Sequence, residues 1–240
     1  FKLAIVGKSH LYLICLWYTR AAQMSIAALT TALRILRELR GPSDWLIYLL
    51  SSYAIEWEVN QVAAPLWIFG YGSLIWRADF AFVERRAGYI KHWARRFWQG
   101  SEDHRGVPGA PGRVVTLVES PTSHCMGMAY RVATEQTDSV MAQLDYREKG
   151  GYDRLTIDVH FTDQPPVTAI TYHATAANEH YLGPASAAAI ANQVFAAAGP
   201  SGSNSEYVLE LDQALQQLEH HDPHVTNIAA EVRRLHEAAK

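Results

Sequence analysis

A glycine-rich turn is the first segment whose residue types suggest chemistry. The apolar run 66–69 stops at Gly70, and Gly72 follows, so a buried strand runs into a tight turn. Glycine permits positive φ and close backbone approach, and successive N–H groups in such a turn form a concave site for a carboxylate. The pattern fits an ordinary turn equally well. It is not a dinucleotide fingerprint, because Ile75 replaces the third glycine, and a nucleophile elbow would need Ser at position 72.

A carboxylate at the end of an apolar helix stripe is the second candidate. Val140 and Leu144 share one face of a helix expected over residues 135–149, and Glu148 lies four residues beyond Leu144. Burial of this side chain and its place at the negative end of the helix dipole would both raise its pKa, as a general acid/base requires. The alternative is an exposed residue in the last turn, paired with a basic neighbour, Arg147 or Lys149.

Two further groups are weaker candidates. The segment His220–His224 carries three histidines and Asp222, but it lies at a helix break, where adjacent side chains point in different directions. Cys125 follows His124 on an expected strand, so the two side chains face opposite ways and do not form a nucleophile–base pair. We therefore expect no metal site and a buried, structural Cys125.

The elements that must position these residues alternate in type along the chain. Helical spacing is present over residues 21–40 and 43–58, and a helical N-terminal extension, residues 1–64, is expected to precede a domain at residues 65–240. Within that domain we expect strands at 66–69, 88–99, 113–119, 125–132, 154–161 and 167–173. Helices are expected at 135–149, 186–198, 207–218 and 225–239, the third after a capping box of Ser203 and Glu206. This order predicts an α+β fold with a largely antiparallel or barrel-like sheet.

Composition excludes several classes of protein. The 240 residues are 49% hydrophobic and carry a formal net charge of −3, which argues against nucleic-acid binding. The apolar run 11–18 is too short to span a bilayer, and we expect neither export nor membrane attachment. Cys15 and Cys125 form no CxxC pair, so a reduced, cytoplasmic setting is the default. The sequence leaves the oligomeric state open.

Several blocks of sequence together resemble the ChaC-like γ-glutamylcyclotransferases. The turn lies in WIFGYGSLIW at 67–76, and Glu148 lies in DYREKGGY at 145–152. Three further blocks follow the family's order across residues 65–220, namely FWQGSEDHRG at 97–106, PGR at 111–113 and GPSGSNSEY at 199–207. Residues 1–64 have no counterpart in the resemblance.

The resemblance implies a small mixed, barrel-like sheet flanked by helices, with Glu148 as the catalytic acid/base. It implies that the γ-glutamyl end of a substrate is held by the turn, which consists of Phe69, Gly70, Tyr71, Gly72, Ser73 and Leu74. Tyr152 is a further candidate substrate contact. The implied activity is the cleavage of glutathione to 5-oxoproline and Cys-Gly.

That reaction requires neither cofactor nor metal, because the attacking amine belongs to the substrate. Arg105 or Arg113 is expected to hold the distal carboxylate of glutathione, since arginine binds carboxylates with two parallel hydrogen bonds. Two alternatives remain: a cyclotransferase for other γ-glutamyl amino acids or amines, and a non-catalytic γ-glutamyl-binding module on the same fold.

Overall fold

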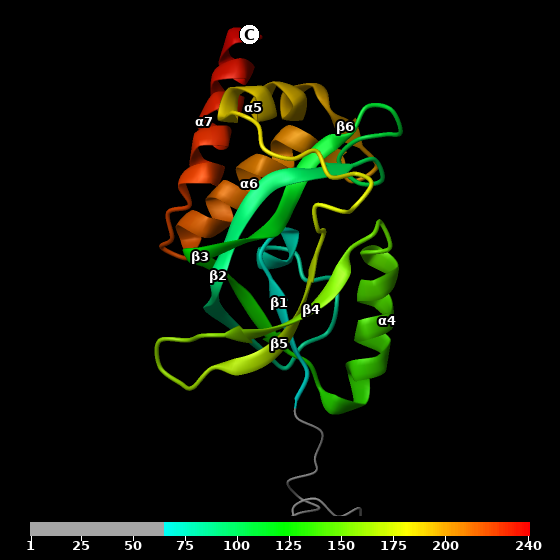
Figure 1. Ribbon diagram of the computed structural model, residues 1–240, viewed down its shortest axis with the longest axis vertical. Coiled ribbons are helices and arrows are strands. Elements are labelled where there is room, and N and C mark those ends of the chain that lie inside the picture. Colours follow the sequence, from blue (N-terminus) through cyan, green and yellow to red (C-terminus); the bar gives the residue numbers. More distant parts are fainter. Residues whose placement is uncertain (1–64) are drawn as a thin grey trace, which may run out of the picture. The chain divides into compact units, whose positions relative to one another are not determined.

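A computed structural model describes residues 65–240 of the chain. The helices expected at 21–40 and 43–58, the status of the extension 1–64 and the setting of Cys15 lie outside the described residues. Within the described part, strands and helices form a mixed α+β arrangement (Figure 1), which confirms the predicted fold class.

A five-stranded mixed sheet forms the centre of the domain. Its spatial order is β2-β3-β1-β5-β4, with β1 antiparallel to β3 and parallel to β5. The strands span Trp67–Gly70 (β1), Glu84–Ser101 (β2), Gly112–Arg131 (β3), Asp153–Val159 (β4) and Val167–His173 (β5). The sheet is not closed by a continuous ladder. One antiparallel bridge between Tyr89 and His160 links its two edges, and this gives the sheet its barrel-like form.

The long β2–β3 hairpin corrects one prediction. Residues 113–119 and 125–132 were expected as two strands, but they belong to the single strand β3. The register against β2 shifts between Lys91 and Trp93, where His92 has a φ of 66° and its ring Nδ1 lies 2.7 Å from the carbonyl oxygen of Pro121. The polar residues around Pro121 therefore form an irregularity within one strand.

Helices complete the domain close to their predicted limits. They are α4 (Thr137–Arg147), α5 (Ala187–Ala196), α6 (Asn204–Gln217) and α7 (Pro223–Ala238), with short 3-10 turns η1 (Ser73–Ile75) and η2 (Thr134–Gln136). The predicted N-cap of α6 is confirmed, because the Ser203 hydroxyl accepts a hydrogen bond from the backbone N–H of Glu206 at 3.1 Å. A two-stranded ribbon of β6 (Ala198–Gly199) and β7 (Gly202–Ser203) leads into α6.

Two hydrophobic clusters attach the helices to the sheet. Helices α5, α6 and α7 gather together, away from α4 (Figure 1), and share a cluster with β2 and β3 that includes Phe97, Leu117 and Val208. Val140 and Leu144 of α4 pack in a second cluster, with Ile68 and Tyr130. The second cluster confirms the apolar stripe predicted for α4, and it fixes the end of α4 beside β1.

No helix within residues 65–240 has the length and apolar character needed to cross a membrane.

Candidate active site

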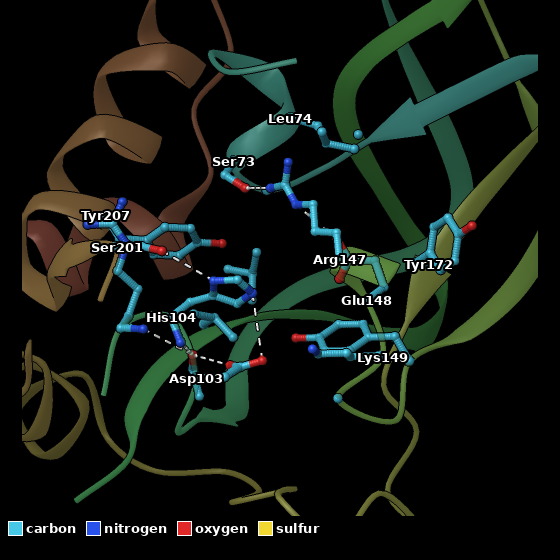
Figure 2. Close-up of a pocket in the computed structure, with 18 of the residues that line it drawn as sticks. Ser73, Leu74, Asp103, His104, Arg147, Glu148, Lys149, Tyr172, Ser201 and Tyr207 are labelled. Atoms are coloured by element: carbon cyan, nitrogen blue, oxygen red, sulfur yellow. Dashed lines mark hydrogen bonds and ion pairs between the residues drawn. The ribbon is translucent and has the colours of Figure 1, made fainter. Parts of the chain in front are cut away.

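One cavity of about 950 Å³ collects the two leading candidates (Figure 2). Its lining includes the turn 69–74, the loop 100–105 and the segment 146–152 that ends α4. Residues about 75 positions apart in the sequence therefore face the same space. After the roles that the resemblance implies, we call residues 69–74 the substrate loop and residues 148–152 the catalytic turn.

Glu148 lies at the C-terminal end of α4, where its backbone N–H donates to the carbonyl of Leu144 at 2.9 Å. Its side chain is 20% exposed, so the predicted burial is present. Burial raises the pKa of the Glu148 carboxyl, and nearby Asp103 adds to the increase, whereas Arg147 and His104 oppose it. Because desolvation is the largest effect, the net pKa is above the usual range of a glutamate.

The alternative ion pair is also present and has a further partner. Arg147 Nε lies 3.3 Å from Glu148 Oε1, and Arg147 Nη2 donates to the Ser73 hydroxyl at 2.6 Å (Figure 2). Arg147 therefore connects the catalytic turn to the substrate loop. Lys149 forms no such pair within the described residues; its Nζ lies over the Tyr146 ring, 4.2 Å from the centroid.

The substrate loop is closely packed, and its glycines allow neighbouring atoms to approach the backbone closely. Neither Gly70 nor Gly72 has a positive φ, so the conformational use of glycine allowed by the sequence does not occur here. A Cβ on Gly70 would lie 2.3 Å from Cβ of Leu74, and one on Gly72 would lie 3.0 Å from the Tyr207 hydroxyl. Tyr71 is buried, and its hydroxyl donates to the carbonyl of Tyr172 at 2.7 Å.

Arg95 does not line the cavity, but it supports the substrate loop, and no role was predicted for it from the sequence. It lies on β2, is 1% exposed, and donates from Nε to the Tyr71 carbonyl at 2.6 Å and from Nη1 to Asp222 Oδ2 at 3.0 Å. In a trans peptide the C=O and the following N–H point in opposite directions, so the Gly72 N–H points away from Arg95. No acceptor for this N–H is present among residues 65–240. The available signal was the pair Arg95-Arg96 between the apolar residues Ala94 and Phe97 of an expected strand, where one of two adjacent side chains must point toward the core.

The two predicted carboxylate-binding arginines differ in position. Arg105 lines the cavity, but its Nη1 already donates to the Ser203 carbonyl at 2.9 Å and to Glu206 Oε2 at 2.8 Å. Arg113 is absent from the lining. Its guanidinium donates to Gln193, to the Phe97 carbonyl and to the Gly183 carbonyl, at 2.7, 2.9 and 3.0 Å. Through these bonds Arg113 attaches the start of β3 to β2, to α5 and to the segment that contains Gly183.

Tyr152, the further candidate for a substrate contact, lies in the cavity lining directly after the glycines of the catalytic turn. Its N–H donates to the Glu148 carbonyl at 3.3 Å. Burial, followed by the neighbouring Tyr71 and Glu148, raises the pKa of its hydroxyl well above the usual value, so the hydroxyl stays protonated and is a donor at neutral pH.

His104 and Asp103 also face the cavity, although no role was predicted for them. His104 Nδ1 lies 3.2 Å from the Ser201 hydroxyl, and its Nε2 lies 3.6 Å from Asp103 Oδ2 (Figure 2). Both influence the pKa of Glu148 from the loop that follows β2. The signal was their place in the block 97–106.

The weaker candidates have structural partners. His224 Nε2 accepts the backbone N–H of Phe97 at 3.0 Å, and Asp222 caps α7 while it pairs with Arg95. Cys125 is buried, and burial raises the pKa of its thiol, which disfavours the reactive thiolate. Residues 65–240 contain no cluster of three or more side chains suited to hold a metal ion.

The fold is γ-glutamylcyclotransferase-like. A yeast crystal structure of a γ-glutamyl cyclotransferase specific to glutathione superposes with a TM-score of 0.66 at 28% identity, covering 71% of this chain and 96% of that one. A family model described as "ChaC-like protein" matches residues 66–235, and the chain belongs to this family.

Curated relatives agree with this assignment. Glutathione-specific gamma-glutamylcyclotransferase 1 of Rattus norvegicus is 46% identical over 165 residues, which cover 67% of this chain and 74% of the rat protein. The Danio rerio protein of the same name is 45% identical and is covered over 88% of its length. Gamma-glutamylcyclotransferase 2-3 of Arabidopsis thaliana is 42% identical over 179 residues.

Proposed function

We propose that the protein cleaves glutathione by intramolecular cyclisation of its γ-glutamyl group, giving 5-oxoproline and Cys-Gly. The observation that carries the proposal is the buried carboxyl of Glu148 in a cavity shared with the substrate loop. The names of the relatives at 45–46% identity support glutathione as the substrate.

Glu148 serves as base and then as acid. Its carboxylate takes a proton from the α-ammonium of the glutamyl group, and the freed amine attacks the γ-carbonyl carbon to close a five-membered ring. The bond from that carbon to the cysteine nitrogen then breaks. Its electron pair stays on the nitrogen, which receives the proton held by Glu148, so the carboxylate is restored. The ring nitrogen loses its second proton as the lactam forms, and the released amine of Cys-Gly takes up one proton, so the reaction has no net change in protons. A raised pKa suits both steps, because general acid/base groups work best near the operating pH.

The substrate loop binds and orients the γ-glutamyl end. The Gly72 N–H points away from Arg95 and is available to a carboxylate or to the developing oxyanion. Holding amine and carbonyl in attack geometry is worth up to roughly 7–11 kcal/mol. Tyr152 adds a protonated hydroxyl close to Glu148.

The leaving dipeptide is assigned to the part of the cavity lined by the loop 100–105. Arg105 remains the candidate for its terminal carboxylate, because it lines the cavity, whereas Arg113 lies outside the lining. A cytoplasmic setting belongs to the proposal as well, since glutathione is the thiol buffer of that compartment.

The test is 5-oxoproline release from a panel of γ-glutamyl compounds. Glutathione should be turned over, with Cys-Gly formed in equal amount, and γ-glutamyl-alanine should react much more slowly. Equal rates for the two compounds would favour a general γ-glutamyl amino acid cyclotransferase. Saturable binding of glutathione without 5-oxoproline would instead identify a binding module.

A further inference from the structure

The side chain of Asn178 joins two segments that meet at the cavity. Its Oδ1 accepts from Gln99 Nε2 at 3.0 Å and from the backbone N–H of His180 at 2.9 Å. Its Nδ2 donates to the carbonyl of Gly151 at 2.6 Å and to that of Gly150 at 3.2 Å. One amide thus uses both of its ends, the oxygen toward β2 and the nitrogen toward the catalytic turn.

The β2 side of this network is fixed. The Gly100 N–H donates to the His180 carbonyl at 2.8 Å, and the Leu182 N–H donates to the Trp98 carbonyl at 2.8 Å. Gln99 itself is 1% exposed. Asn178 is therefore attached to the end of a core strand, and the catalytic turn is attached to Asn178.

The turn has a shape that depends on this contact. Gly151 has a φ of +85°, a conformation that glycine adopts without strain. A Cβ at Gly151 would also lie 2.5 Å from Asn178 Nδ2, so any larger residue would push the amide away. The second glycine of the turn is thus required both by its backbone conformation and by the approach of Asn178.

We propose that Asn178, anchored by Gln99, is a positioning residue that holds the catalytic turn and thereby keeps the Glu148 carboxyl buried and aligned. The proposal rests on the acid/base role of Glu148 proposed above. Asn178 is uncharged, so it acts on Glu148 through geometry. The titratable groups that interact electrostatically with the Glu148 carboxyl are Tyr71, Asp103, His104, Arg147 and Tyr152, and Arg147 contacts it.

The primary test is Asn178→Ala, compared with Asn227→Ala on the exposed side of α7. Loss of the amide frees two carbonyls and lets the turn relax toward water, and misplacement of a catalytic group by about 1 Å costs roughly 100-fold. We expect kcat for 5-oxoproline release to fall by about 10- to 100-fold, with KM changed less than about threefold. Asn227→Ala should leave both constants unchanged.

The pH profile separates positioning from general support of the fold. In the free enzyme Glu148 must be ionised to act as base, so kcat/KM falls as pH drops through its pKa. Greater hydration of the carboxyl lowers that pKa, so the acid limb of Asn178→Ala should move to lower pH. Global destabilisation alone would not move the limb of the folded fraction. Gly151→Ala disturbs the same contact from the side of the turn. The loss in log kcat of the double variant should therefore be smaller than the sum of the two single losses.

Each outcome decides between the two proposals. A folded Asn178→Ala variant with kcat within twofold of wild type, or with an unshifted acid limb, overturns the positioning role and leaves the proposed function intact. Substantial activity in Glu148→Gln would instead overturn the acid/base assignment, and the positioning role with it.

Discussion

The two walls of the cavity are held by different parts of the molecule. Carbonyl groups of the substrate loop are bound by donors from three strands of the sheet: Thr171 to Phe69 at 2.8 Å, Arg95 to Tyr71 at 2.6 Å and Tyr130 to Leu74 at 2.5 Å. These donors belong to β5, β2 and β3. The wall proposed to recognise the substrate is therefore continuous with the core.

The catalytic turn lies at the edge of the domain. It follows a helix whose last turn carries Tyr146, a residue 72% exposed, and its glycine carbonyls are held by the single amide of Asn178. The proposed binding surface and the proposed proton-transfer group therefore depend mainly on separate supports, and Arg147 connects the two. Changes in the substrate loop should reduce stability together with affinity, whereas changes at Glu148 should reduce turnover in a stable protein.

The largest expected effect is that of Glu148→Gln. Glutamine keeps the size of the side chain but cannot accept the ammonium proton, so the substrate amine stays non-nucleophilic. General acid/base groups contribute about 10²–10⁴-fold, and Glu148 is proposed to serve two proton steps, so kcat should fall by the upper part of that range or more. KM should change little. The measurement is single-turnover 5-oxoproline release.

The matched control for that variant is Glu135→Gln, an exposed residue of η2. It should retain the full rate. A well-folded Glu148→Gln variant that keeps more than about a tenth of the wild-type rate would assign the acid/base role to another residue.

Gly70→Ala should show the coupling of stability and activity in the other wall. The added methyl would overlap Cβ of Leu74 at 2.3 Å, so the backbone of the loop must shift. Overpacking of this kind costs about 1–3 kcal/mol in the free energy of unfolding, and the shifted loop should also bind substrate poorly. Urea unfolding and steady-state kinetics measure the two effects.

Gly72→Ala is the comparison for that variant, because its closest contacts are side-chain atoms of Tyr207 and Val115 at 3.0 and 3.1 Å. Gly72→Ala should lower the free energy of unfolding and the substrate affinity by less than Gly70→Ala does. Equal losses for the two variants would contradict the claim that the fit of Gly70 against Leu74 sets the shape of the loop.

Arg95→Lys is expected to act mainly on KM. Lysine keeps the buried charge opposite Asp222 but lacks the fork that also reaches the carbonyls of Tyr71 and Met126. A hydrogen bond from a charged donor is worth about 1.5–3 kcal/mol. Because the bond to Tyr71 supports the substrate loop, we expect its loss to raise KM roughly tenfold, while the loss of the bond to Met126 lowers stability. Arg96→Lys, on the next residue of the same strand, should leave KM unchanged. An unchanged KM for Arg95→Lys would show that the carbonyl needs no anchor.

Local sequence patterns predicted most helices and strands, and they pointed to the glycine turn and to Glu148 as candidates for the site. The apolar stripe on α4 and the N-cap at Ser203 depend on neighbours in sequence, so both were predicted correctly, whereas the Glu206 carboxylate pairs with Arg105 and does not complete a capping box. The single strand β3 was predicted wrongly as two strands, because Pro121 and its polar neighbours are typical of a loop. In the structure a shift in register against β2 accommodates them.

Long-range contacts account for what the sequence did not predict. Arg95 donates to a carbonyl 24 residues away, and Asn178 reaches one 27 residues away, and a periodicity argument contains no such pairings. The assignment of Arg113 to substrate rested on residue type alone. Its burial and its three protein acceptors were decided by the packing of β3 against two other segments.

The smallest expected effect is a stability difference between Glu148→Gln and wild type that depends on pH. Burial raises the pKa of Glu148, so the folded protein binds this proton more tightly than the unfolded chain does. The stabilising contribution is fully present below the unfolded-state pKa and is lost as pH rises through the folded-state pKa. Glutamine does not ionise, so the variant avoids that loss of stability. It also lacks the ion pair with Arg147, so its net gain in the free energy of unfolding should stay below about 2 kcal/mol.

Urea unfolding between pH 4 and about pH 8 should show the free energy of unfolding of the variant rising relative to that of wild type as pH rises, with a plateau above the folded-state pKa. A difference that does not change with pH would mean that Glu148 ionises as readily in the folded protein as in the unfolded chain, and the catalytic turn would then lack the desolvation on which its proposed chemistry depends.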